Sequence, residues 1–265
     1  FFDRLPAGPA RELALVEQGP GALLPGGGVG ALAVGGWFLR REGMSRPDIV
    51  ERSSALFFLT SAVNVAALIG ASALLVTGVM VGPHDLVRTG LPILAGLLVT
   101  AAVAAVPKLL RRSPRSGWLA DLTAGIDGAV RSLRRPSGRL AGAAAYLGLD
   151  IAALGATFAA TGHALPVAPL VLAYLIGYLA NLIPVPGGFG VLEGGLAGAL
   201  IAYGAPATQA TAAVIIYHAI AFWIPSLGGL LGYALLRARQ TRRRARPAER
   251  RLPGASVGLE PRPAW

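Results

Sequence analysis

The sequence predicts an all-α fold: a polytopic helical membrane protein with helix hairpins that are broken by Pro and Gly. Of the 265 residues, 54% are hydrophobic and only 14% are charged, a balance typical of membrane proteins and unlike that of a soluble domain. Several apolar windows reach the roughly 20 residues needed to cross about 30 Å of hydrocarbon. Two apolar regions contain similar Pro/Gly-rich breaks, which predict an inverted repeat.

Apolar segments follow one another from the N-terminus. Residues 10–24 and 30–41 are expected to form a short hairpin around Pro25-Gly26-Gly27-Gly28, because Pro and Gly disfavour helical backbone. Residues 166–183 and 190–203 are expected to form a second hairpin around a second break. Each vertex either stops inside the bilayer, as in a re-entrant hairpin, or passes through it. The long crossings are expected at 53–81, 89–106, 140–161 and 207–236.

Two other segments carry most of the charge. The loop 108–138 is basic, and its apolar residues recur at helical spacing, which predicts an amphipathic helix lying on the membrane surface. Residues 1–237 are interpreted as one transmembrane domain that includes this loop. Residues 238–265, rich in Arg, Pro and Glu, are expected to form a disordered basic tail. The chain begins at Phe1 without an initiator methionine, which predicts an N-terminally truncated sequence.

The net charge of +11 follows the membrane topology. Arg and Lys gather in the loop 108–138, in the tail and after residue 39, so the positive-inside rule places these segments in the cytoplasm. Aromatic residues are not interleaved with the basic ones, and no nucleic-acid partner is expected. The sequence has no cysteine and its three histidines are far apart, so we expect no catalytic site, metal or cofactor.

This orientation makes the two hairpins open toward opposite sides. The hairpin at 10–41 opens toward the cytoplasm and the hairpin at 166–203 opens toward the outside. Similar sequences in opposite orientations are the signature of an inverted repeat. The aligned segments are Pro25-Gly26-Gly27…Gly30 with Pro186-Gly187-Gly188…Gly190, and Gly43-Met44-Ser45 with Gly204-Ala205-Pro206.

The second break supplies a candidate site. Irregular backbone at membrane depth is tolerated only where protein or a water-filled cavity surrounds it. The helix that starts after the break would present free N–H groups and a positive dipole end, which favour an anion such as a lipid phosphate. The alternative is a tight, Gly-packed turn without a ligand. The residues assigned here to lipid binding or transport are Asn181, Pro186, Gly187, Gly188, Gly190 and Glu193.

Ionisable residues within the apolar segments extend this site. Glu193 is interpreted either as a functional carboxylate or as a cap for its own helix. The first hairpin has Ala33 at the aligned position. Asp150, in the middle of a crossing, is interpreted either as functional or as an interhelical hydrogen-bond partner. Tyr217 and His218 lie in the last crossing. His218 either pairs with Asp150 or Glu193 and titrates near neutral pH, or bonds a backbone carbonyl.

These residues together resemble a known family. The segment 181–193, the Pro-Gly-Gly element near residue 25 and the run Tyr217-His-Ala-Ile-Ala-Phe-Trp-Ile-Pro225 are similar to the lysylphosphatidylglycerol synthase transmembrane region. The resemblance, which extends to about residue 237, implies a flippase-like, multi-pass protein of a bacterial or archaeal plasma membrane that moves or recognises lipids. Members commonly carry Arg where this chain has His218, so a titratable group replaces a permanent phosphate-binding cation.

We therefore expect an integral membrane protein, not an enzyme, that binds an anionic or phosphate-bearing phospholipid or isoprenoid-linked lipid and translocates it between leaflets. The alternative is a non-transporting membrane anchor or lipid-binding partner of a cytoplasmic enzyme, which the surface helix and basic tail would suit. An intramembrane enzyme acting on lipid-linked sugar is disfavoured, because no nucleophile or metal set supports it. The aminoacyl-transferase domain of some family members is not in this sequence, so lipid aminoacylation is not expected.

Overall fold

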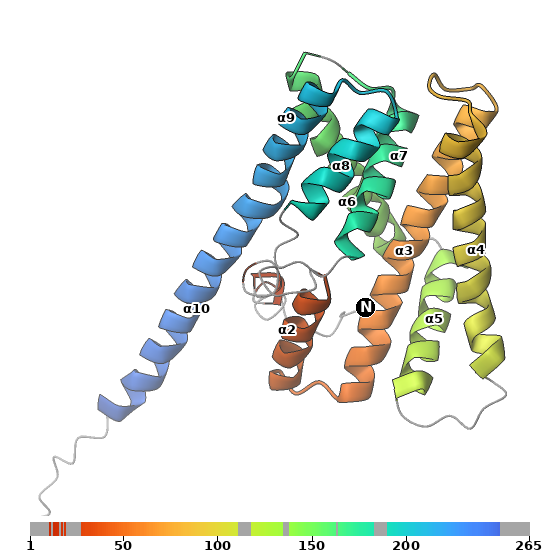
Figure 1. The fold of residues 1–265 in the computed structure, drawn as a ribbon. Coiled ribbons are helices and arrows are strands. Elements are labelled where there is room, and N and C mark those ends of the chain that lie inside the picture. Colours follow the sequence, from red (N-terminus) through yellow and green to blue (C-terminus); the bar gives the residue numbers. More distant parts are fainter. Residues whose placement is uncertain are drawn as a thin grey trace, which may run out of the picture.

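The computed structural model describes residues 11, 13–15, 17, 19, 28–110, 118–134, 138–162, 164–182 and 190–249, and most of them are helical. The helices run between two ends of the molecule, called upper and lower here as Figure 1 draws them. Among the described residues, four helices are long and apolar enough to cross a bilayer: Arg46–Val76, Leu86–Lys108, Gly138–Ala160 and Ala207–Leu235. The predicted all-α, polytopic membrane fold is confirmed.

Two of these helices form one side of the molecule. α3 (Arg46–Val76) rises from the lower end, and α4 (Leu86–Leu110) returns to it (Figure 1). α3 begins at Ser45, whose hydroxyl accepts a hydrogen bond from the amide of Asp48 at 3.2 Å. An accepting hydroxyl at this position satisfies a helix-terminal amide, which explains why the helix starts there.

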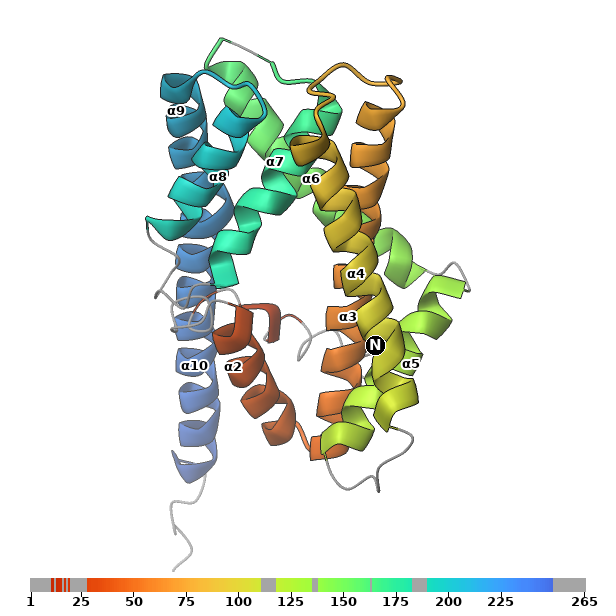
Figure 2. The same cartoon turned by 45° about the vertical axis from the view of Figure 1, so that its right-hand side comes forward.

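α5 (Trp118–Arg134) differs from the surface helix that the sequence predicts. It packs lengthwise against the lower part of α3 (Figures 1 and 2). The two helices approach closely because the residues between them are small. A Cβ placed on Gly125 would lie 2.5 Å from the Cβ of Ser54. Ile126 is buried in this contact, whereas Leu133 of the predicted apolar face is 40% exposed. Helical periodicity predicts an apolar face, but it does not say what covers that face.

The upper half contains a hairpin of two short helices. α6 (Gly138–Ala160) rises to the upper end, α7 (Val167–Gly177) descends into a 3₁₀ turn, η2 (Tyr178–Leu182), and α8 (Val191–Ala202) returns to the upper end. At 1.5 Å per residue, α7 and α8 are each roughly 17 Å long, which is too short to cross about 30 Å of hydrocarbon. Their lower ends lie near the middle height of the molecule (Figure 2). The re-entrant hairpin stays a prediction.

Glycines bring the two arms of this hairpin into backbone contact. A Cβ placed on Gly195 of α8 would lie 2.5 Å from the Cβ of Ala180 and 2.7 Å from the carbonyl oxygen of Gly177. A Cβ on Gly177 would lie 2.7 Å from the Cα of Leu196. Small residues at such crossings allow the close packing that drives helix association in a membrane.

The main hydrophobic core surrounds this hairpin. It joins α6, α7 and α8 to the upper part of α3 and to α9 (Ala207–His218). Leucines on four of these helices have no exposed surface: Leu75, Leu154, Leu172, Leu196 and Leu200. The hairpin is therefore held on several sides by buried side chains.

The last crossing is one continuous helical run. α9 passes through a π-helical turn, η4 (Ala219–Trp223), into α10 (Ile224–Glu249). Pro225 has no amide hydrogen to bond the preceding turn, which accounts for the irregular backbone before it. The helix continues beyond the predicted boundary, so residues 238–249 of the predicted disordered tail are helical. Arg and Ala are good helix formers, and this favours the extension. Residues 250–265 lie outside the described residues.

The lower half contains α2 (Gly28–Arg41), which descends from the middle height to the lower end (Figure 1). A second core cluster of Leu13, Phe38, Leu39 and Ile49, with Tyr233 against it, joins α2 to the first arm, α3 and α10. The break at 20–27 lies outside the described residues.

The turns after α2 and α8 have the same hydrogen-bond pattern. The amide of Met44 donates to the carbonyl of Leu39 at 3.0 Å, and the amide of Ala205 donates to the carbonyl of Leu200 at 2.9 Å. In each turn the preceding residue is a glycine, with φ of 91° and 101° respectively. These are Schellman-type helix ends, and they occur where the sequence alignment pairs the two hairpins.

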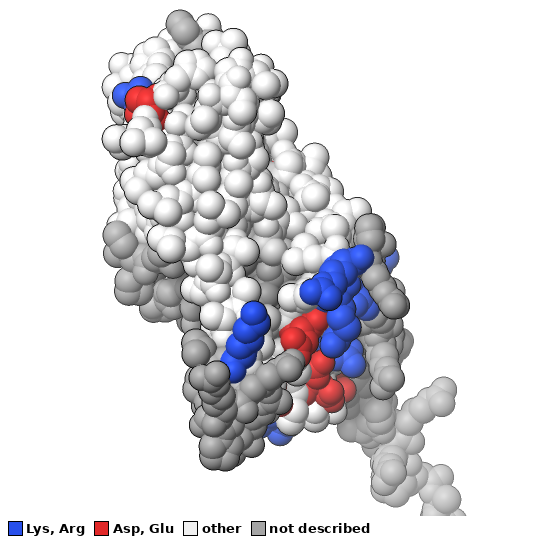
Figure 3. Space-filling model, turned by 90° about the vertical axis from the view of Figure 1, so that its right-hand side faces the viewer, with Lys and Arg blue, Asp and Glu red and all other residues white. Residues whose placement is uncertain are grey.

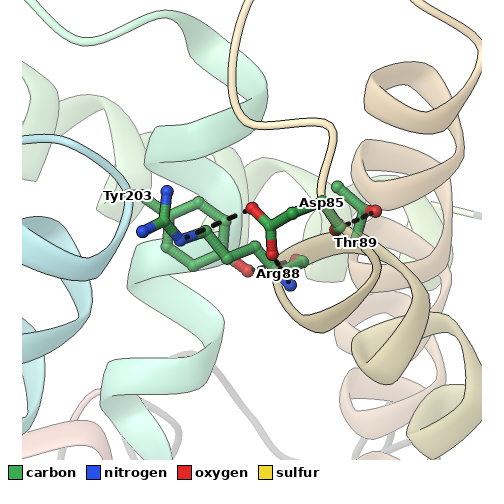
Figure 4. A network of polar contacts seen from close by, with 4 residues as sticks. All are labelled: Asp85, Arg88, Thr89 and Tyr203. Atoms are coloured by element: carbon green, nitrogen blue, oxygen red, sulfur yellow. Dashed lines mark hydrogen bonds and ion pairs between the residues drawn. The ribbon is translucent and has the colours of Figure 1, made fainter.

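The upper end is fastened by a small polar network (Figure 4). Asp85 starts α4 by accepting a hydrogen bond from the amide of Arg88 at 3.0 Å, and its carboxylate lies 3.6 Å from the Arg88 side chain. The Tyr203 hydroxyl, after the end of α8, donates to the carbonyl of Arg88 at 2.6 Å. Burial raises the pKa of Tyr203 to about 12, so this hydroxyl stays protonated at neutral pH. The network links the hairpin to α4.

Charged side chains gather at the lower end. On the face drawn in Figure 3, blue and red atoms crowd the lower end, and a single blue and red group lies near the upper end. The surface between them is white, as expected for a band that faces hydrocarbon. The described basic residues of the lower half include Arg40, Arg41, Arg46, Arg52, Lys108, Arg131, Arg134, Arg139 and Arg237.

Candidate functional site

A carboxylate held by tyrosines lies in the middle of the upper bundle. Asp150 lies about 15 Å from the upper end of α6, at 1.5 Å per residue. Its Oδ2 accepts a hydrogen bond from the Tyr174 hydroxyl at 2.5 Å, and its Oδ1 accepts one from the Tyr217 hydroxyl at 2.8 Å. The Tyr178 hydroxyl lies 3.0 Å from that of Tyr217. We call these four residues the tyrosine–aspartate cluster.

Three helical segments bring this cluster together. α6 supplies Asp150, α7 and its 3₁₀ turn supply Tyr174 and Tyr178, and α9 supplies Tyr217. Tyr174 and Tyr178 lie one turn apart, with ring centroids 4.6 Å from each other. Tyr174 and Tyr217 are 5% and 1% exposed, so their hydroxyls have left water and depend on these partners.

A second carboxylate lies in contact with a histidine beside the cluster. Glu193 Oε1 lies 2.9 Å from His218 Nδ1. The His218 side chain is 3% exposed and that of Glu193 is 26% exposed. The other oxygen, Glu193 Oε2, is buried and has no hydrogen-bond partner among the described residues. The pair joins the first turn of α8 to the end of α9, and the Phe222 ring lies 5.0 Å from the His218 ring.

The two polar groups are neighbours because Tyr217 and His218 are consecutive residues. On a helix, consecutive side chains point in directions about 100° apart. Tyr217 therefore reaches Asp150 on α6, whereas His218 reaches Glu193 on α8. The π-helical turn η4 starts directly after His218, and such turns are frequent at functional sites. The end of α9 thus connects both carboxylates.

The structure gives side-chain partners to two of these residues. His218 pairs with Glu193 rather than with Asp150. Asp150 forms interhelical hydrogen bonds to α7 and α9. Gly190, at the start of α8, has a φ of 75°, a backbone conformation that residues other than glycine rarely adopt. The predicted residues Pro186, Gly187 and Gly188, and the side chain of Asn181, lie outside the described residues.

Sequence reasoning missed three residues of interest. Tyr174 and Tyr178 were read as part of an apolar segment, although two tyrosines one turn apart in such a segment signal a polar face. Glu17 lies in the first hairpin arm, and its carboxylate packs on α2. A Cβ placed on Gly35 would lie 2.2 Å from Glu17 Oε1. The first hairpin therefore also carries a carboxylate, on the arm before its break.

The side chains of the site are carboxylates, phenols and an imidazole, which can donate or accept hydrogen bonds and protons. The described residues contain no group of three or more metal-ligating side chains. The N-terminus of α8 adds free amides and a positive dipole end beside Glu193.

Comparisons with known proteins agree with this architecture. A family model described as lysylphosphatidylglycerol synthase TM region matches residues 5–229. A UPF0104 membrane protein of Methanothermobacter thermautotrophicus is 34% identical over 84 residues, which cover 31% of this chain and 24% of that relative. The aligned part is thus about a quarter of the length of this curated relative. No solved structure matches significantly. The chain is a multi-pass membrane protein, and it belongs to the lysylphosphatidylglycerol synthase transmembrane region family.

Proposed function

We propose that this protein binds an anionic or phosphate-bearing lipid and translocates it between the leaflets of a membrane. The observation that carries the proposal is the pair of partly buried carboxylates, Asp150 and Glu193, beside a hairpin whose arms are too short to cross the bilayer. Charged groups at membrane depth cost roughly 2.5–3.5 kcal/mol each on insertion scales, so they are retained mainly where they serve function.

The broken hairpin suits a lipid headgroup. The start of α8 directs amides and its positive dipole end toward the break, where a phosphate would be stabilised. The contact of Glu193 with His218 lies at the same place, so a bound headgroup would compete with Glu193 for the imidazole. The lipid would enter by its headgroup while its chains stay among the exposed apolar side chains of the bundle.

We also propose that the two hairpins are inverted repeats, one opening toward each side. The matching turns after α2 and α8 support this, as does the glycine on each second arm, Gly35 and Gly195, that contacts its first arm. Inverted repeats around a site at middle depth are the architecture of many secondary transporters. In this proposal the chain acts on lipids without chemical change to them, so it is not an enzyme.

The proposed location is a prokaryotic plasma membrane with the lower end in the cytoplasm. Nine of the described basic residues lie in the lower half, whereas Arg88 lies at the upper end. The positive-inside rule assigns the basic end to the cytoplasm. The loop 108–138 and the C-terminal tail would then both be cytoplasmic.

The test is lipid movement in reconstituted vesicles. The purified chain is placed in vesicles of phosphatidylcholine and phosphatidylglycerol that carry fluorescent NBD-phosphatidylglycerol in both leaflets. Added dithionite destroys only the outer label, so movement of inner lipid is seen as a continued loss of fluorescence. We expect acceleration with the native chain and a slower loss with Glu193→Gln. The matched control, Glu42→Gln, removes an exposed carboxylate at the lower turn and should behave as the native chain.

The proposal is tested with two labelled lipids, phosphatidylglycerol and polyprenyl phosphate. Circular dichroism confirms that each variant remains helical. If the native chain fails to accelerate labelled phosphatidylglycerol or labelled polyprenyl phosphate, translocation of such lipids is refuted. Equal rates for Glu193→Gln and Glu42→Gln would remove Glu193 from the transport site.

A further inference from the structure

We infer that the hydroxyls of Tyr178 and Tyr217 form a proton relay to Asp150, so that Asp150 takes up and releases one proton in each transport cycle. This inference rests on the proposed lipid translocation and names the proton as its coupling ion. It is carried by three hydrogen bonds in series and by the single proton that each phenol can donate.

Counting protons fixes the direction of the relay. Tyr217 has one hydroxyl proton, which it donates to Asp150 Oδ1 at 2.8 Å. In the contact of 3.0 Å between Tyr178 and Tyr217, the proton must therefore come from Tyr178. Tyr174 donates to the other oxygen of Asp150 at 2.5 Å. This set of hydrogen bonds belongs to the ionised form of Asp150, which accepts from both phenols.

Uptake of a proton reverses this chain without moving a heavy atom. A proton delivered to the Tyr178 oxygen lets the original Tyr178 proton pass to Tyr217, and the Tyr217 proton pass to Asp150 Oδ1. Each O–H bond that breaks is replaced by one that forms, so both phenols end neutral. Asp150 ends as a neutral acid that donates back to Tyr217, and Tyr217 then donates to Tyr178. Release runs through the same steps in the opposite order.

The position of Tyr178 supplies the entrance. It is the first residue of η2, the turn that ends α7 before the break, and it is half-buried, whereas Tyr217 is 1% exposed. Asp150 therefore exchanges protons with its surroundings through Tyr178.

The other ionisable side chains near Asp150 form no hydrogen bond to it among the described residues. On its own helix, Tyr146 lies one turn away and is 67% exposed. Residues 53–76 of α3, which pack beside α6, contain no ionisable side chain. On α5, Asp127 and Arg131 are exposed. The Glu193–His218 pair, on α8 and α9, is the ionisable neighbour that would sense the charge of Asp150.

The experiment compares two Tyr→Phe variants in proteoliposomes. Tyr178→Phe removes the first hydroxyl of the relay and leaves both hydrogen bonds to Asp150. Tyr146→Phe makes the same chemical change one turn from Asp150, outside the relay, and serves as the control. Vesicles of phosphatidylcholine and phosphatidylglycerol contain the pH-sensitive dye pyranine, and NBD-phosphatidylglycerol reports lipid movement. A pH difference is imposed across the membrane, and both signals are recorded together.

We expect Tyr178→Phe to slow proton entry by about tenfold or more, because proton transfer needs a hydrogen-bonded neighbour. Lipid movement in this variant should lose its dependence on the pH difference, whereas Tyr146→Phe should keep both signals. Asp150→Asn, which removes the acceptor, should abolish proton entry. Lipid movement by the native chain that is indifferent to the pH difference, without proton entry, would overturn the relay and leave translocation standing. Proton entry without lipid movement would overturn translocation and the coupling with it.

Discussion

The crossing of α7 and α8 gives a prediction whose size follows from two glycines on one helix. Gly195 faces α7, and a Cβ there would lie 2.5 Å from the Cβ of Ala180 and 2.7 Å from the oxygen of Gly177. Gly198, less than one turn further along, has open space around its own Cβ position. Both sites lie inside α8, so Gly→Ala makes the same chemical change at each.

The difference in the free energy of unfolding between the two variants measures the packing at Gly195 alone. Alanine favours a helix over glycine by about 1 kcal/mol, and this gain applies at both sites. Overpacking a close contact costs typically 1–3 kcal/mol. At position 195 one of the atoms in the way is a backbone oxygen, which cannot rotate aside as a side chain can. We therefore expect Gly195→Ala to be less stable than Gly198→Ala by about 1–3 kcal/mol.

The assay is reversible unfolding in mixed micelles. Increasing fractions of sodium dodecyl sulfate unfold the native chain and both variants, and far-UV circular dichroism gives the free energy of unfolding for each. Gly198→Ala should match or exceed the native chain, whereas Gly195→Ala should fall below it. Equal free energies for the two variants would refute the backbone contact between α7 and α8, and with it the tight hairpin.

Three further predictions use the same preparations. Tyr203→Phe loses the hydrogen bond of 2.6 Å to the Arg88 carbonyl, and we expect a loss of about 0.5–1.5 kcal/mol in the free energy of unfolding. Gly190→Ala forces a side chain onto a backbone with φ of 75°, which should cost about 1–3 kcal/mol although its surroundings are open. Glu17→Gln should slow the dithionite-detected movement of labelled phosphatidylglycerol while Glu42→Gln does not, and equal rates would assign Glu17 to packing alone.

Hydropathy predicted the crossings well because the bilayer acts on composition directly. A helix that faces hydrocarbon must be apolar along its length, so α3, α4, α6 and the run from α9 into α10 could be read from the sequence. The short arms of the second hairpin could also be read, since a run of several Pro and Gly residues disfavours helical backbone. The residues of a helix do not determine which other element packs against it, and the position of α5 against α3 was therefore not predicted.

The partner choices in the site could not be predicted for a related reason. The sequence offered Asp150 and Glu193 as partners of His218, and only the helix arrangement decides between them. Tyr174 and Tyr178 were overlooked because a tyrosine ring fits an apolar helix, although its hydroxyl needs a hydrogen-bond partner when it is buried. The partners of these hydroxyls become visible only in the structure, where α6 and α9 bring Asp150 and Tyr217 within hydrogen-bond distance.

Glu17 and Tyr178 occupy equivalent positions in the two hairpins. Counted back from the aligned prolines Pro25 and Pro186, Glu17 takes the same place as Tyr178. Each lies on a first arm that packs against a glycine of the second arm, Gly35 or Gly195. The lower hairpin thus has a carboxylate where the upper hairpin has the entrance of the relay. If the hairpins exchange roles during transport, a proton that enters on one side at Tyr178 has an acceptor on the other side at Glu17. Two hairpins with different proton-binding groups at one position would bind the proton with different affinities in the two halves of such a cycle.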